Sequence, residues 1–241
     1  MFEKPQYIIT GDKHGQYDIM DYLCDTCGTT LQDVLIILGD AGINYYGDSR
    51  DNRLKDYLAK YPVTIFSIHG NHERRPSTIA TYKETMWKGG IVYYEEDYPN
   101  LLFAKDGEIY DFDGKKVLVL GGAYSVDKWH RLAMGYHWFE DEQPSQEIKD
   151  YVEAQLEKVG WKVDVVLSHT APLKYEPTEV FLRGIDQSKV DKSTEIWLDK
   201  IEDKLDYKKW YCGHYHTEKI IDKIEFMFDM FHEFNDDVES E

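Results

Sequence analysis

Short apolar runs, rich in β-branched residues and apolar at nearly every position, recur along this chain and restrict the folds open to it. The clearest are Tyr7–Thr10, Val34–Leu38, Val63–Ile68, Val117–Leu120 and Val163–Leu167. A strand with one face in water would show polar residues at alternate positions, whereas a continuous run suits a strand covered on both faces. The sequence therefore predicts a sheet core that other layers of structure cover.

Helical patterns lie between several of these runs. They cover Asp51–Lys60, Gln146–Val159 and Thr194–Leu205. The second pattern is the strongest, because apolar residues recur at every fourth position, Ser145 can cap its start and Gly160 can end it. This mixture of strands and helices predicts an α/β fold.

A second strand-rich stretch occupies the middle of the chain. Its segments are Ile91–Tyr94, Leu101–Ala104 and Glu108–Phe112. Asp113-Gly114 is a hairpin-turn signal between the last of these and the run at Val117–Leu120. Glu218–Phe228 can supply two more strands. We predict two packed sheets with helices outside them and, because no repeat or linker is visible, one domain over residues 1–241.

Five polar clusters follow apolar runs. They are Gly11-Asp12-Lys13-His14, Gly39-Asp40, Gly70-Asn71-His72-Glu73, Ser168-His169 and Gly213-His214-Tyr215-His216. In open α/β sheets, functional residues gather at the carboxyl ends of the strands, so one rim would bring these clusters together. Their carboxylate, amide and imidazole groups suit Mn, Fe or Zn. The clusters therefore predict a ligand set for two metal ions.

The acidic composition excludes some partners. The formal net charge is −18 at pH 7, and such a surface repels phosphate backbones and anionic lipid. Long nucleic acids and membranes are therefore not expected as partners. Two bound divalent ions would add four positive charges in one place, which still allows a small anion to bind.

The start at Met1–Pro5 lacks signal-peptide features, and no apolar run reaches membrane-spanning length, so we expect a cytoplasmic protein.

Cys24 and Cys27 form a C-x-x-C pair, and Cys212 is the third cysteine. Such a pair can be redox-active or supply half of a zinc site. The sequence holds no second pair to complete a four-thiolate site, and the residues before Cys24 have a helical pattern. We favour small buried residues in a reducing compartment.

Taken in order, the five clusters resemble the motifs of the calcineurin-like metallophosphoesterase family, and the resemblance extends from Asp12 to His216. It implies a four-layer α/β/β/α sandwich of two mixed sheets flanked by helices, with two divalent metal ions. The ligands of one ion would be Asp12, His14 and His216. The ligands of the other would be Asn71, His169 and His214. Asp40 would bridge the pair, because two cations about 3.5–4 Å apart need an anionic group between them.

The same resemblance implies a mechanism. A hydroxide held between the metal ions would attack the phosphorus of a phosphate ester. Asp40 and His72 would be the catalytic side chains, and His72 would stabilise the transition state or protonate the leaving group. Manganese, iron and zinc all accept these ligands. We favour manganese and keep iron and zinc as alternatives.

The segment 121–147 resembles one found in small bacterial and phage-type members of the family. It can be an aromatic-rich surface connection, or it can form a wall or lid over the metal ions. In the second case Lys128, His130 or Arg131 would bind substrate phosphate. Arg74 and Arg75, which follow the Asn-His pair, are further candidates for this role.

The sequence departs from the protein Ser/Thr phosphatase branch of the family. That branch carries an Asp-Arg-Gly after its Gly-Asp motif and an arginine before its Gly-Asn-His motif, whereas this chain reads Gly39-Asp40-Ala41-Gly42-Ile43-Asn44 and Ile68-His69-Gly70-Asn71. We therefore favour small or exposed phosphomonoesters or diesters as substrates. A nuclease or a nucleotide or cyclic-nucleotide phosphodiesterase is the alternative. A phosphoprotein phosphatase and a non-catalytic binding module are less favoured, and the oligomeric state stays open.

Overall fold

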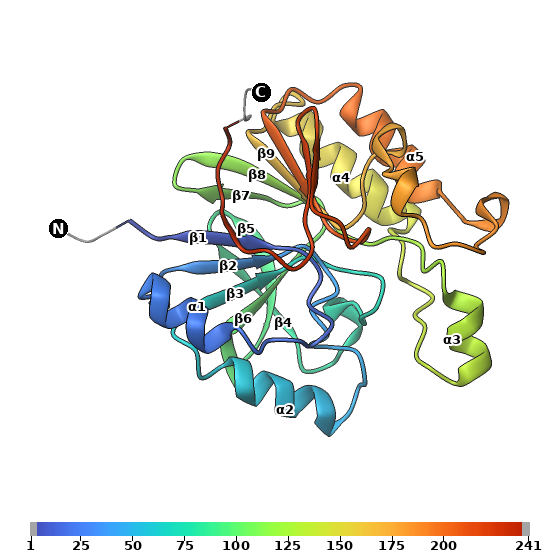
Figure 1. Ribbon diagram of the computed structural model, residues 1–241. Coiled ribbons are helices and arrows are strands. Elements are labelled where there is room, and N and C mark those ends of the chain that lie inside the picture. Colours follow the sequence, from blue (N-terminus) through green and yellow to red (C-terminus); the bar gives the residue numbers. More distant parts are fainter. Residues whose placement is uncertain (1–3, 238–241) are drawn as a thin grey trace.

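Two mixed β-sheets lie face to face at the centre of the molecule, in a computed structural model that describes residues 4–237 (Figure 1). The first has the order β13 (His232–Glu233), β1 (Tyr7–Thr10), β2 (Val34–Ile37), β3 (Thr64–Ser67), β6 (Tyr98–Ala104), β5 (Gly90–Glu95) and β4 (Lys83–Trp87). The second has the order β11 (Lys219–Ile221), β12 (Ile224–Phe226), β10 (Lys209–Cys212), β9 (Val165–Ser168), β8 (Lys115–Leu120) and β7 (Ile109–Phe112).

The central strands of each sheet are parallel and the edge strands are antiparallel. Strands β1, β2, β3 and β6 are parallel neighbours in the first sheet. Strands β8, β9, β10 and β12 are parallel neighbours in the second. Because parallel strands end at the same edge of a sheet, the residues that follow β1, β2 and β3 share one rim. The residues that follow β9 and β10 share the corresponding rim of the second sheet.

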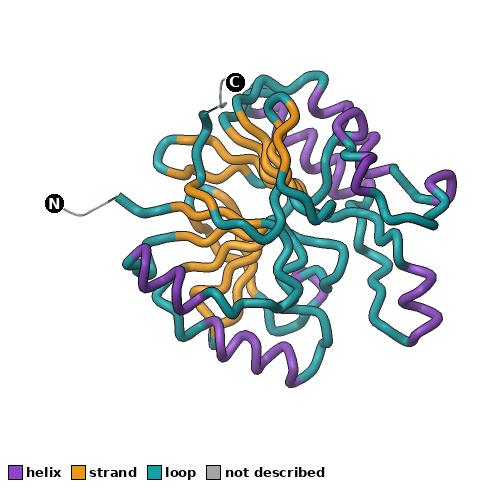
Figure 2. The backbone as a smooth tube through the Cα atoms, in the orientation of Figure 1, coloured by secondary structure: helices purple, strands orange, loops and turns teal. Residues whose placement is uncertain are grey.

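Helices cover the outer faces of both sheets (Figures 1 and 2). Helices α1 (Met20–Cys27) and α2 (Ser49–Leu58) pack on the first sheet, and α4 (Gln146–Lys158) and α5 (Ser193–Glu202) pack on the second. Helix α3 (Lys128–Met134) stands away from both layers and has no buried residue. Four 3₁₀ turns complete the described structure: Pro76–Thr78, Leu173–Tyr175, Thr178–Val180 and Gln187–Lys189.

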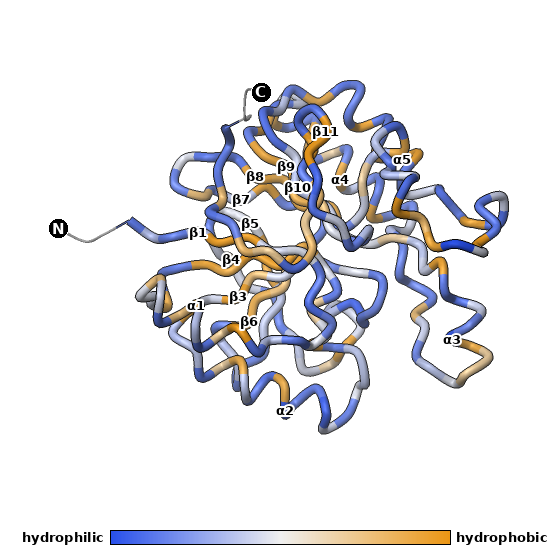
Figure 3. Tube along the Cα trace, in the orientation of Figure 1, coloured by the Kyte–Doolittle hydropathy of each residue, from blue (hydrophilic) through white to orange (hydrophobic). Residues whose placement is uncertain are grey.

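Three apolar clusters fill the three spaces between these four layers. Phe66 of β3 and Tyr211 of β10 belong to the cluster between the sheets. Leu23 of α1 packs with strands of the first sheet, and Leu156 of α4 packs with strands of the second. The strands are accordingly the most apolar segments of the trace (Figure 3). This arrangement confirms the predicted α/β fold of two mixed sheets flanked by helices.

Most of the predicted elements are present. Ser145 Oγ accepts a hydrogen bond from the Ile148 N–H at the start of α4, as its capping role predicts. Asp113 and Gly114 have φ angles of 54° and 90° and connect β7 to β8 in an antiparallel hairpin. Helix α2 begins at Ser49, two residues before the predicted start, because Asp48 caps it by accepting from the Arg50 N–H.

Some elements were not predicted. Strand β4 is mostly exposed, so it lacks the apolar signal on which the prediction relied. The 121–147 segment contains helix α3 as well as irregular connections.

In the part of the chain that the structure describes, no helix combines the length and apolar character needed to cross a membrane. The single-domain prediction over 1–241 stays a prediction, and residues 1–3 and 238–241 lie outside the described residues.

Candidate metal centre

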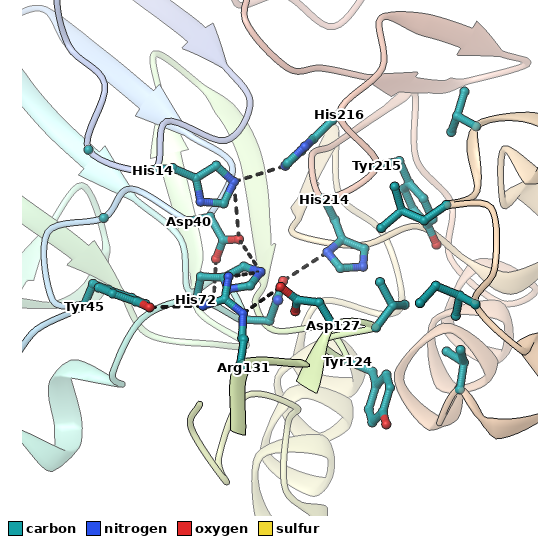
Figure 4. Close-up of a pocket in the computed structure, with 18 of the residues that line it drawn as sticks. His14, Asp40, Tyr45, His72, Tyr124, Asp127, Arg131, His214, Tyr215 and His216 are labelled. Atoms are coloured by element: carbon teal, nitrogen blue, oxygen red, sulfur yellow. Dashed lines mark hydrogen bonds and ion pairs between the residues drawn. The ribbon is translucent and has the colours of Figure 1, made fainter. Parts of the chain in front are cut away.

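The five polar clusters meet where the carboxyl-terminal rims of the two sheets face each other. Figure 4 shows His14, Asp40, His72, His214 and His216 converging on one space. Two groups of carboxylates and imidazoles have their ligand atoms within 4.8 Å of one another. They are Asp12, His14 and His216, and Asp12, Asp40 and His169. Residues far apart in the sequence thus come together because they follow parallel strands.

The first predicted ligand set is closely spaced. His216 Nε2 lies 3.2 Å from Asp12 Oδ2 and 3.1 Å from His14 Nε2. The distance from His14 Nε2 to Asp12 Oδ2 is 3.8 Å. A backbone contact fixes the carboxylate, because the His214 N–H donates to Asp12 Oδ1 at 2.8 Å. Asp12 is 1% exposed, so its second oxygen faces the two histidines rather than bulk water.

The second predicted set is centred on the amide oxygen of Asn71. Asn71 Oδ1 lies 2.8 Å from His169 Nε2 and 3.0 Å from His214 Nδ1. The Asn71 amide nitrogen donates to Ser125 Oγ at 2.8 Å, which turns the oxygen toward the imidazoles. Asn71 and His169 are both buried.

Asp40 lies between the two sets. Its Oδ2 atom is 3.9 Å from His14 Nε2 and 3.7 Å from His169 Nε2, one histidine from each set. Its other oxygen, Oδ1, accepts a hydrogen bond of 2.7 Å from the His72 N–H. One oxygen is thus fixed by the backbone and the other is directed at both sets, as a bridging ligand would be.

The candidate ligands fit a cation because hydrogen-bond acceptors among them face one another. His169 Nδ1 lies 2.7 Å from the Leu38 carbonyl oxygen, so the hydrogen-bond network places the ring proton there. His169 Nε2 then presents a lone pair to Asn71 Oδ1, which is also an acceptor. Two acceptors at 2.8 Å repel each other unless a cation lies between or beside them. These residues therefore fit a divalent ion, with oxygen and nitrogen ligands.

Backbone strain is concentrated at the same positions. Of the eight non-glycine residues with positive φ in residues 4–237, four are predicted ligands: His14, Asp40, His214 and His216. Left-handed backbone is costly for these residues and is a common feature of functional sites. Gly70 permits a close approach, because a Cβ atom there would lie 2.1 Å from the Asp40 backbone nitrogen.

The charges in the site suit metal binding. Burial alone would raise the pKa of Asp12, but the hydrogen bond with His216 and the surrounding histidines hold this pKa below its usual range. Asp12 is therefore ionised at neutral pH. Burial, followed by the neighbouring His169, lowers the pKa of His214 to about 3, so this ring is neutral and keeps a lone pair. The hydrogen bond with Asp12 raises the pKa of His216, so a cation would compete with a proton for this ring.

His72 lies beside the two sets. Its Nε2 atom is 3.9 Å from Asp40 Oδ2 and 3.4 Å from Arg131 Nη2. Burial and the positive charge of Arg131 lower the pKa of His72 to about 3, so the ring is neutral at neutral pH. The side chain thus faces both the proposed bridging carboxylate and a guanidinium.

Arg131 is the predicted phosphate-binding residue that reaches the site (Figure 4). Its Nε donates to Asp127 Oδ2 at 2.8 Å and its Nη1 to the Tyr45 hydroxyl at 3.2 Å. These contacts hold the guanidinium plane toward His72. Tyr124, Val126 and Asp127 of the 121–147 segment also line the cavity, so this part forms a wall, and the lid interpretation stays a prediction.

The other predicted phosphate-binding residues lie elsewhere. Lys128 Nζ sits 3.7 Å above the Trp138 ring, and His130 is exposed. Neither lines the cavity, and neither does Arg74. Arg75 is buried and donates to Asp106 Oδ2 at 2.6 Å, which makes it part of the packing between the sheets and the 121–147 segment.

Five of the seven candidate ligands line a cavity of about 970 Å³, namely His14, Asp40, Asn71, His214 and His216. Sequence reasoning missed several residues that line it, including Tyr45, Tyr46 and Arg50. Arg50 lies 3.8 Å from the ring centre of Tyr46. The Tyr-Tyr pair after Gly39-Asp40 was the available signal, since it follows a ligand cluster closely.

The cysteine pair does not line the cavity: Cys24 and Cys27 are free, and Cys24 packs in the core under α1.

Comparison with known proteins identifies the family. The model of the calcineurin-like phosphoesterases matches residues 6–218, which include every predicted ligand. The chain therefore belongs to the calcineurin-like phosphoesterase family. Membership implies hydrolysis of phosphoesters with divalent metal ions. No curated protein sequence matches the chain significantly.

Solved structures resemble the chain at low sequence identity. One is the protein TT1561 of Thermus thermophilus, at 12% identity and a TM-score of 0.47, with 88% of this chain and 82% of that chain covered. Another is the phosphopantetheinyl hydrolase PptH from Mycobacterium tuberculosis, at 14% identity and a TM-score of 0.48, with 93% and 88% covered.

Proposed function

We propose that the protein hydrolyses small phosphate esters with two divalent metal ions, one held by each of the two side-chain sets and both bridged by Asp40. The position of Asp40 Oδ2, within 3.9 Å of one histidine from each set, is the observation that supports this most strongly. A single ion would not require six candidate ligands in addition to the Asp40 carboxylate. Bound divalent ions would polarise the phosphoryl oxygens and lower the pKa of water in the site.

His72 and Arg131 are proposed to hold the phosphoryl group. Arg131 is fixed by Asp127 and Tyr45, so its remaining N–H groups are directed at the space beside His72. A guanidinium in this position suits a phosphate oxygen. His72 is neutral at neutral pH in the free site, so it would donate a hydrogen bond from its ring N–H. A phosphate dianion beside the ring would raise its pKa and so favour the protonated ring, which could then donate a proton to the leaving group.

The cavity and the charge favour small substrates. A volume of about 970 Å³ suits a ligand of metabolite or nucleotide size. The net charge of −18 opposes the binding of a long phosphate backbone outside the metal centre. We therefore propose a small phosphoester as the partner and no long nucleic acid. Among the metals, manganese is our first choice, with iron and zinc as alternatives.

A phosphodiesterase is the second candidate, and the shape of the cavity favours it. Tyr45 lies on one side of the candidate ligands, and Tyr124 and Tyr215 lie on the other (Figure 4). A diester has two organic groups, and the cavity offers space on both sides of the proposed metal ions. Cyclic nucleotides are diesters of suitable size, and nucleotides offer monoester and anhydride groups at a similar size.

A substrate screen tests the proposal. Protein loaded with Mn²⁺ would be assayed with p-nitrophenyl phosphate, its bis-ester, nucleotides, cyclic nucleotides and a phosphopeptide. We expect hydrolysis of at least one small ester, abolished by a chelator and restored by Mn²⁺. Hydrolysis of the bis-ester but not the monoester would select the phosphodiesterase candidate. Failure on every small ester with both metal ions bound would contradict the proposal.

A further inference from the structure

One end of the cavity has a composition that phosphate hydrolysis does not require. This side pocket is lined by Glu176, Phe181, Leu182, Ile185, Glu195 and Tyr215. Tyr215 directly follows the predicted ligand His214, so the side pocket adjoins the metal centre (Figure 4). An ester bound at the metal ions would therefore extend its organic group into this space.

The walls of the side pocket are mostly apolar. The rings of Phe181 and Tyr215 are stacked, with an interplanar angle of 13°. Leu182 is 61% exposed, although it belongs to a segment that lines the cavity. Exposed apolar side chains around a concave space mark a binding surface for an apolar group.

A buried carboxylate at the wall lacks a complete set of partners. Glu195, in the first turn of α5, is 4% exposed. Its Oε1 atom accepts a hydrogen bond of 2.9 Å from Thr170 Oγ1, which also lies 3.1 Å from the Tyr215 hydroxyl. Its Oε2 atom is buried and has no hydrogen-bond partner among the described residues. A buried acceptor left without a partner is destabilising, and a ligand donor would relieve this cost.

The local charge is negative when Glu195 is ionised. Glu176 is neutralised by Lys192, whose Nζ lies 2.6 Å from Glu176 Oε2. Glu195 forms no ion pair among the described residues, and Lys192 acts on it only from a greater distance, so its charge at the cavity wall is only partly compensated. Burial raises the pKa of Glu195 to about 7, and an ammonium group beside it would favour the ionised form.

We propose that the side pocket binds the leaving-group side of the substrate, and that this group is an apolar chain or ring that carries an amine which contacts Glu195. The proposal rests on the proposed function, because the metal ions fix the phosphoryl end. It names the substrate class: phosphoesters of amino alcohols, in which an apolar spacer separates the ester oxygen from a protonated amine.

Binding of phosphonates tests the side pocket without turnover, because a simple alkyl phosphonate has no P–O ester bond to hydrolyse. Aminohexyl phosphonate and hexyl phosphonate would be titrated calorimetrically into the Mn²⁺-loaded protein, with butyl and octyl pairs to allow for spacer length. We expect the amine to lower Kd by about 10- to 100-fold for the best spacer, the range for a hydrogen bond to a charged group. Equal Kd values at every length would overturn the proposal.

Variants locate the effect. Glu195→Gln keeps the shape of the side chain and removes its charge, so the ratio of the two Kd values should fall close to one. Leu182→Lys changes an exposed position and adds a cation that repels the amine, so it should also reduce the ratio. It provides a second test if Glu195→Gln, a change at a buried position, fails to fold. Glu157→Gln, an exposed change on α4, is the matched control and should keep the full ratio. A full ratio in both Glu195→Gln and Leu182→Lys would contradict the proposal.

The phosphonate result and the enzymatic result are separable. If the protein prefers the amine but hydrolyses no ester, the side-pocket proposal is supported and the proposed function is contradicted. If the protein hydrolyses p-nitrophenyl phosphate but shows no preference for the amine, the proposed function is supported and the side-pocket proposal is contradicted.

Discussion

The two regions of the cavity are built differently. At the candidate metal centre, Asp12, Asp40, Asn71 and His169 are buried and follow central parallel strands, and backbone hydrogen bonds fix the two carboxylates. The outer walls come largely from long connections, residues 121–147 and 176–190, with many exposed side chains, and partly from Tyr45, Tyr46 and Arg50. Helix α3 in the first of these has no buried residue at all.

This difference separates reaction from specificity. The rim holds the candidate ligands and catalytic groups in a fixed geometry, because the strands beneath it are fully packed. The connections carry no such constraint and can change without disturbing the core. We infer that the rim sets the chemistry and the walls set the substrate. Mutations on the rim should therefore affect the rate strongly, and mutations on the walls should affect affinity.

The largest effect is expected for Asp40→Asn. Asparagine tolerates the left-handed backbone at φ 49°, so the fold should be retained while the bridging charge is lost. Activity should fall to that of the metal-free protein, a greater loss than the ~10²–10³-fold caused by removing one electrostatic contact. Metal content by mass spectrometry and hydrolysis of p-nitrophenyl phosphate measure both consequences. Normal turnover in this variant would show that Asp40 does not bridge.

His72→Asn should have the next largest effect. The ring lies 3.9 Å from Asp40 Oδ2 but belongs to neither predicted ligand set. We expect kcat to fall by about 10²–10⁴-fold, as for loss of a general acid, with metal content unchanged. Loss of metal in this variant would move His72 into the ligand set.

Arg131→Ala tests the boundary between rim and wall. Arg131 comes from α3 but reaches His72, so it should affect phosphate binding without affecting the metal ions. Loss of a charge-assisted hydrogen bond of about 1.5–3 kcal/mol predicts a rise in KM of about 10- to 100-fold. Steady-state kinetics of Arg131→Ala and Arg131→Lys would measure it, and lysine should recover only part of the affinity. An unchanged KM in the alanine variant would remove Arg131 from the site.

Lys128→Ala should have the smallest effect. Lys128 lies on the same helix as Arg131 but rests on the Trp138 ring, outside the cavity lining. We expect kcat and KM within about twofold of the wild type, because an exposed cation–π contact contributes only ~0.5–1 kcal/mol to stability. A large rise in KM would mean that the wall moves to bring Lys128 to the substrate.

The sequence allowed the rim to be predicted more fully than the walls. Asp12, Asp40 and His169 follow buried strands whose continuous apolar runs are visible in the sequence, and parallel strands bring their ends together. Arg50 gave no comparable signal, because an arginine at the start of a polar helix is usually a solvated surface residue. Its place in the cavity depends on how α2 packs against the first sheet.

Glu195 shows the same limit from another side. In the sequence it is one of 46 acidic residues, and it stands in the first turn of a helix, where a carboxylate is common. Its burial depends on a long-range contact with Thr170, whose hydroxyl also contacts the Tyr215 hydroxyl. Strand β4 and helix α3 were missed for a related reason: their side chains are mostly exposed, so no apolar periodicity marks them.

Anomalous diffraction from crystals grown with Mn²⁺ would show whether two cations share Asp40. A site bridged by Asp40 predicts two anomalous peaks, one beside Asp12, His14 and His216 and the other beside Asn71, His169 and His214, with an Asp40 oxygen contacting both. A single peak, or two peaks with Asp40 turned away from one of them, would contradict it.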